Sequence, residues 1–123
     1  MMRRYAAALL LFWGLVAAGH AQLAGETVRI EEPAAEDLYL AGRWVEVAAA
    51  VAGDVVAAGQ SITVTGPVEQ DLIAAAERIR IDAPVGDDLR VAGRRVELSA
   101  DVGDHLVAAG EHVVLAADSI GGF

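Results

Sequence analysis

The sequence of 123 residues contains no cysteine, which excludes disulfide bonds, thiolate metal sites and a cysteine nucleophile. A lipoprotein anchor is excluded as well, because it needs a cysteine. Lysine is also absent, and 9 arginines stand against 18 acidic residues. Without Arg3 and Arg4, 7 basic residues remain against the 18, a net charge of −11. Such an excess argues against nucleic acid as a partner, and against unaided docking on anionic lipid.

The chain also lacks a long hydrophobic run. Its apolar stretch at residues 5–18 has about 14 residues, whereas a membrane span needs roughly 20. Two arginines precede this stretch and a small-x-small site at residues 19–21 follows it, which predicts a secretory signal peptide over residues 1–21. We therefore expect an exported protein of the periplasm or cell envelope, with no membrane span after cleavage. The alternative is an uncleaved N-terminal anchor in the inner membrane.

What the chain does have is a repeat of 17 residues that begins near His20 and continues almost to the C-terminus. One column of the repeat contains aspartate and then histidine: Asp37, Asp54, Asp71, Asp88 and His105. Alanine fills another column, and the next column is glycine except at Ala76: Gly25, Gly42, Gly59, Gly93 and Gly110. A repeat this regular, and too short for a helical hairpin, predicts a solenoid over residues 22–123.

Within each repeat, apolar residues alternate with residues of the opposite face. Leu72 and Ala74 form one pair, and Ile79 and Ile81 form a second, which is the period of a β-strand. A lone valine gives a third inward position, at Val51, Val68, Val85 and Val102. The prediction is an all-β fold, a single-stranded parallel β-helix of about six 17-residue coils. The unequal spacing of the inward residues, seven and then six, favours a right-handed coil.

Charged residues follow the same register. Opposite charges are predicted to face each other in adjacent coils at Glu26 and Arg43, Arg29 and Glu46, Arg80 and Glu97, and at Arg94 between Glu77 and Glu111. Each such pair contributes about 0.2 to 1 kcal/mol. The pairs therefore penalise a slip in register more than they stabilise the stack.

Repeats of the form Asp-Leu-x-Val-Ala-Gly-x-x-Val-x-Leu-x-Ala-x-Val-Gly-Asp occur at Asp88–Asp104 and, in looser form, at Asp54–Asp71. They resemble the repeats of bactofilins and their relatives, which are polymer-forming cytoskeletal proteins. The resemblance implies a right-handed β-helix that associates end to end into nonpolar filaments without nucleotide and serves as a scaffold. Bactofilins are cytoplasmic, so the export signal predicts an exported relative.

The aspartate column Asp37, Asp54, Asp71 and Asp88 allows two interpretations. Strands about 4.8 Å apart bring these like charges close together, and a cation such as calcium would relieve the repulsion. Alternatively, each aspartate caps its turn by accepting backbone N–H bonds. The glycine-rich nonapeptide of calcium-binding β-rolls is absent, so we expect no metal and no cofactor.

The sequence offers no catalytic constellation, and we expect a non-enzymatic protein. His105 and His112 fall in turn or surface columns with no serine or cysteine placed beside them. The alternative function is that of a secreted polysaccharide-binding or polysaccharide-cleaving module, because extracellular β-helices often act on polysaccharide and carboxylates are plentiful. However, no repeat carries an insertion that would build a cleft.

Two features predict self-association, with an envelope component as a further partner. The outward positions Tyr39, Val56, Ile73 and Val107 form an apolar stripe, interrupted by Arg90, which marks a contact face or reflects strand propensity. Open β-helix ends are templates for pairing with another chain. Residues 120–122 close a row after a one-residue slip at residues 118–119, and Phe123 stands where the next strand begins. The chain polymerises through this edge or belongs to a longer protein.

Overall fold

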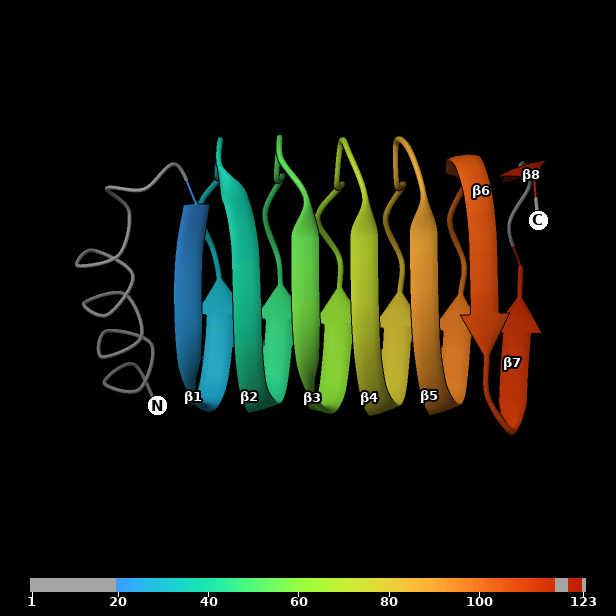
Figure 1. Cartoon of the computed structure of the whole chain (residues 1–123), viewed down its shortest axis with the longest axis horizontal. Helices are drawn as coiled ribbons and strands as arrows, with labels where there is room; N and C mark the ends of the chain where they lie inside the picture. The colour runs from blue at the N-terminus through green and yellow to red at the C-terminus, as the bar shows by residue number, and fades with distance from the viewer. Residues whose placement is uncertain (1–19, 117–119, 123) are drawn as a thin grey trace.

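The computed structural model describes residues 20–116 and 120–122, and these residues form strands and turns without a helix. The strands are β1 (His20–Ile30), β2 (Asp37–Val47), β3 (Val55–Val64), β4 (Leu72–Ile81), β5 (Leu89–Leu98), β6 (Val102–Ala109), β7 (His112–Leu115) and β8 (Ile120–Gly122). They stack side by side as the successive coils of a solenoid (Figure 1). The predicted all-β solenoid of about six coils is confirmed. Its right-handed sense stays a prediction.

Two sequence predictions fall wholly or partly outside this range. Residues 1–19 of the predicted signal peptide lie outside the described residues, as does Phe123. The last two residues of that segment, His20 and Ala21, pair with β2 as the first residues of β1.

Residues 17 positions apart lie directly opposite each other in adjacent strands. Ile62 pairs with Ile79 across β3 and β4, and Ile79 pairs with Val96 across β4 and β5. All of these pairings are parallel. The third side of each coil is a single bridge between the lone valines, such as Val68 with Val85. The coil thus has the three inward positions that the repeat predicts.

The core is a continuous column of aliphatic side chains inside the coils. In β4 the inward residues Leu72, Ala74, Ile79 and Ile81 are all buried, and the same positions are buried in β2, β3 and β5. No polar or charged side chain is buried among the described residues. Each coil therefore covers the apolar side of the next coil, which is how a short chain obtains a core without a globular interior.

In β1 to β5 the two short strands predicted for each coil are instead one strand that bends at the Ala-Gly corner, whereas the following coil has them as the separate strands β6 and β7. In β2 the alternation of buried and exposed residues stops after Leu40 and resumes at Val45. Backbones approach closely at this corner, since a Cβ added at Gly42 would lie 2.5 Å from the carbonyl oxygen of Gly25. Glycine therefore suits the corner, and Ala76 is the one larger residue in the glycine column.

The last coil departs from the pattern. Ile120 of β8 pairs with Val102, so the register slips by one residue, as the sequence predicts. Val113 and Leu115 of β7 were expected to point inward, yet they are 37% and 43% exposed. They keep the register of Val96 and Leu98, which are buried. The exposure arises because no described strand covers the outer side of β7.

Candidate functional site

The aspartate column forms a ladder of hydrogen bonds along one corner of the solenoid. The Oδ1 atom of Asp37 accepts a bond from the backbone N–H of Asp54 at 2.8 Å. Asp54 accepts from the N–H of Asp71 at 2.9 Å, and Asp71 from the N–H of Asp88 at 3.0 Å. Each half-buried carboxylate thus satisfies a backbone donor of the following coil. The predicted capping of backbone N–H groups is present, but the donor lies one coil further along rather than in the same turn.

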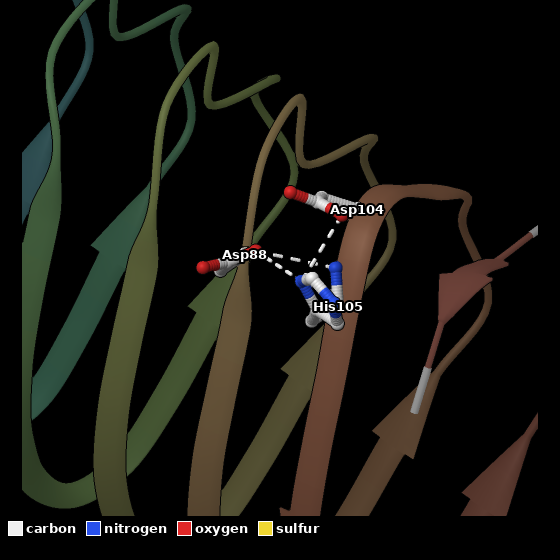
Figure 2. A group of neighbouring side chains, drawn as sticks. All are labelled: Asp88, Asp104 and His105. Carbon is white, nitrogen blue, oxygen red and sulfur yellow. Dashed lines mark hydrogen bonds and ion pairs between the residues drawn. The ribbon is translucent and has the colours of Figure 1, made fainter.

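The ladder of aspartates ends at His105, which occupies the aspartate position in the coil after Asp88. Its backbone N–H donates to Asp88 Oδ1 at 3.2 Å. Its ring Nδ1 lies 3.3 Å from the same oxygen and 3.0 Å from Asp104 Oδ1 (Figure 2). The imidazole therefore contacts two carboxylates of the most acidic corner of the molecule.

Asp87 lies beside this ladder, within reach of the negative charges of neighbouring aspartates. Its carboxyl pKa is raised from the usual 3.8 by desolvation and by the negative charges of Asp71, Asp88 and Asp104. A hydrogen bond from the protonated form to Asp104 acts in the same direction. The Asp87 carboxyl therefore releases its proton less readily than a free aspartate does.

Two groups at this corner have the ligand atoms a cation requires. In each group, Asp71–Asp87–Asp88 and Asp88–Asp104–His105, ligand atoms lie within 4.8 Å of one another. Carboxylate oxygens suit calcium, and an imidazole suits a transition metal. However, Asp71 and Asp88 already use one oxygen each to accept backbone N–H bonds. The hydrogen-bond ladder accounts for the aspartate column without a cation.

The predicted apolar stripe lies on one side of the first half of the strands. Gln22, Tyr39, Val56, Ile73, Arg90 and Val107 are successive register partners. Tyr39, Ile73 and Val107 are exposed, and Val56 is half-buried. A shallow, mainly apolar hollow of about 400 Å³ lies between Tyr39 and Val56. The stripe is therefore continuous except at Arg90.

A second exposed column, on the other half of the strands, was not predicted as a site. Its register partners are Thr27, Trp44, Ser61, Arg78, Arg95 and His112. Two hollows of about 260 and 660 Å³ follow this column and share Glu77 and Arg78 in their walls. Together they form a groove, called here the arginine groove, from Trp44 to His112. The signal is visible in the sequence, because writing it in rows of 17 places two arginines in adjacent coils.

Most arginines outside this column contact a carboxylate. Arg94 lies 2.7 Å from Glu111, and Arg29 lies 3.5 Å from Glu46, as predicted. Arg43 lies 3.8 Å from Glu26. Arg80 is opposite Glu97 in register, but its guanidinium contacts Asp82 at 2.9 Å. These exposed pairs stabilise the stack only weakly.

Within residues 20–116 and 120–122 there is no helix with the length and apolar character needed to cross a membrane. Comparison of the chain with family models, with curated proteins and with solved structures finds no match.

Proposed function

We propose that this protein is a non-catalytic, self-assembling scaffold of the cell envelope, an exported β-helix of the bactofilin kind. The observation that carries the proposal is the exposed apolar side of β7 in the described part of the chain. Val113 and Leu115 are 37% and 43% exposed, whereas their partners Val96 and Leu98 in the preceding coil are 0% and 2% exposed. Covering these side chains with another coil removes apolar surface from water, which favours association.

The backbone at both ends of the described solenoid is suited to the same contact. Among the described strands, β7 has β5 as its one partner, and β1 has β2 as its one partner. Each therefore presents N–H and C=O groups on its outer side, and an open strand edge pairs readily with another strand. A second copy that stacks end on end would satisfy these groups and cover Val113 and Leu115 in one step.

The charges in the column that follows the Ala-Gly corner favour end contacts between two like ends of the solenoid. Glu26 and Glu111 occupy the same column, in the first and the last coil. A head-to-tail contact that continued the register would place these two glutamates opposite each other, and like charges in that position destabilise a sheet. This agrees with the nonpolar filaments that the resemblance to bactofilins implies.

The apolar stripe supplies a second, lateral contact. Tyr39, Ile73 and Val107 are 43%, 40% and 54% exposed on a chain that is otherwise strongly acidic. Apolar side chains that line up on one face are common at protein interfaces. Lateral contacts between filaments, or with another envelope component, would cover them.

Electron microscopy of the protein purified from exporting cells tests the proposal. Fibres are expected from the wild type, and a strictly monomeric species at high concentration would reject the scaffold. Val113→Glu with Leu115→Glu should abolish fibres, because two charges then enter the end contact. Val114→Arg is the control, since Val114 lies in the same strand but in an outward column, where the new positive charge is opposite Glu97.

The lateral contact has its own variants. Ile73→Glu with Val107→Glu should leave single fibres intact and remove their bundling. If these stripe variants abolish the fibres while the Val113 and Leu115 variants keep them, end-to-end stacking is wrong and assembly is lateral.

A further inference from the structure

The arginine groove breaks the charge pattern that the rest of the surface follows. Arg78 and Arg95 are direct register partners on β4 and β5, so their side chains leave adjacent strands about 4.8 Å apart. Like charges in this position destabilise a sheet. Most other arginines in the described part of the chain contact a carboxylate, but Arg78 and Arg95 have neither a salt bridge nor a side-chain hydrogen bond there. Fold stability therefore does not explain this pair.

The groups around the pair form a mixed lining. Glu77, Glu97 and Glu111 stand against Arg78, Arg94 and Arg95 in the larger hollow, with His112 at its end. The charges nearly balance, so the groove does not suit a dense polyanion such as a polyphosphate or nucleic acid. Two free guanidinium forks recognise carboxylates in a bidentate manner. Glutamate oxygens beside them accept bonds from hydroxyl groups.

Trp44 lies in the same column as the pair, two coils before Arg78, with Ser61 between them. Trp44 is 46% exposed, and the Arg43 guanidinium lies over one face of its ring, 5.2 Å from the ring centre, so that a sugar would stack on the opposite face. An exposed indole gives a flat apolar face with a polar N–H at its edge. Beside hydroxyl-binding groups, such a face suits the C–H side of a sugar ring.

We propose that the arginine groove binds an acidic oligosaccharide, a glycan chain that carries carboxylates on its sugar rings. One sugar stacks on Trp44, and carboxylates of the following sugars are held by Arg78 and Arg95. Ser61, Gln60 and Glu77 lie between these points and offer bonds to hydroxyl groups. The side chains of the groove recur once per coil along a straight column, and this arrangement suits an extended oligosaccharide whose sugar rings also recur at a short, regular spacing. The contacts proposed at Trp44, Arg78 and Arg95 use none of the side chains of the end contact, although the groove ends at His112 of β7, the strand of that contact.

Calorimetric titration of the protein purified from exporting cells tests the proposal. The probes are a hexamer of galacturonic acid, a neutral glucose hexamer and inorganic polyphosphate. The galacturonate hexamer is expected to bind, the neutral hexamer at least about ten-fold more weakly. No binding of the galacturonate hexamer, or equally tight binding of polyphosphate, would overturn the proposal.

Matched variants locate the site. Arg78→Gln with Arg95→Gln should weaken galacturonate binding about ten-fold or more, since each charged hydrogen-bonding partner contributes roughly that factor. Arg80→Gln with Arg90→Gln is the control, because it makes the same charge change on the same two strands outside the groove. Equal weakening by both double variants would mean bulk electrostatics and would reject the groove.

Two further measurements separate binding from folding and from charge. The Arg78 and Arg95 double variant should melt no lower than the wild type, because it removes a like-charge pair. A lower melting temperature would give the pair a structural role and contradict the proposal. Trp44→Ala should weaken binding of the galacturonate hexamer, and an unchanged affinity would remove the sugar-stacking part of the site.

Discussion

The carboxylate of Asp71 accepts a hydrogen bond of 3.0 Å from the backbone N–H of Asp88, which lies one coil further along the solenoid. Asp54 makes the same bond to Asp71. A side chain of one coil therefore satisfies the backbone of the next, and the column acts as a hydrogen-bonded ladder. Its negative charge is a cost of this arrangement, because like charges at strand spacing repel.

Replacing Asp71 separates the hydrogen bond from the charge. Asp71→Ala leaves the N–H of Asp88 without its acceptor and should lower the free energy of unfolding by about 1 to 3 kcal/mol. Asp71→Asn keeps an oxygen in place and removes one negative charge, so stability should be unchanged or slightly higher. Chemical denaturation measures both. An alanine variant as stable as the asparagine variant would show that the bond contributes nothing.

Asp87 makes the stability of the protein depend on pH. Its pKa is raised from 3.8 in the folded protein, chiefly by desolvation and by Asp71, so the folded state holds this proton more tightly than the unfolded chain. Stability from this group is therefore lost as the pH rises from about 3.8 through the raised pKa. Asp87→Asn should raise the melting temperature at pH 7, and the gain should vanish below pH 3.8. Glu69→Gln, an exposed carboxylate of the preceding coil, is the control; a gain of equal size there would assign the effect to net charge.

Removing divalent cations tests whether the ladder needs a metal. The ladder oxygens of Asp71 and Asp88 already accept backbone N–H bonds. A chelator should therefore leave the melting temperature unchanged, and added calcium should not raise it. A clear rise with calcium that is lost in Asp71→Asn would identify the Asp71–Asp87–Asp88 group as a cation site.

The core should respond to truncation according to the direction of each side chain. Ile79 is 1% exposed and Ile73 is 40% exposed, although both lie in β4. Ile79→Ala should lower the free energy of unfolding by about 2 to 5 kcal/mol. Ile73→Ala should change it by about 0.5 kcal/mol or less, as is usual at the surface. Similar losses in the two variants, measured on the dissociated monomer, would contradict the inward direction of Ile79 and the outward direction of Ile73.

The stacking of coils was predictable from sequence because inward residues such as Leu72 and Ile79 obey two rules at once. They alternate along the strand, and they recur after 17 residues. Each coil repeats the same pattern of inward and outward residues, so the strands predicted for one repeat are predicted for the other repeats as well. The bend that joins two predicted strands into one was not predictable, since it depends on how the backbone turns at Gly42.

The exposed end, the aspartate ladder and the arginine pair were harder to predict, because each depends on which side chains or strands lie next to it in space. Val113 follows the inward pattern, and its exposure becomes visible only when no described strand is found on the outer side of β7. Capping of backbone N–H groups by aspartate was expected from the residue type. That the donor to Asp71 lies in the next coil could be seen only from the path of the backbone. Arg78 and Arg95 are neighbours when the sequence is written in rows of 17, but their lack of a carboxylate contact could not be predicted without the structure.

The most direct test of the account is a cysteine pair across adjacent coils, which is simple because the chain has no cysteine of its own. Thr63→Cys with Arg80→Cys places cysteines on register partners whose Cα atoms lie about 4.8 Å apart, within the range that a disulfide spans. Thr63→Cys with Glu97→Cys skips one coil, at about twice that separation, and cannot be bridged. Mass spectrometry after mild oxidation should find an intramolecular disulfide in the first variant and none in the second. An intramolecular disulfide in the second variant, or none in the first, would contradict the stacking of residues 17 positions apart.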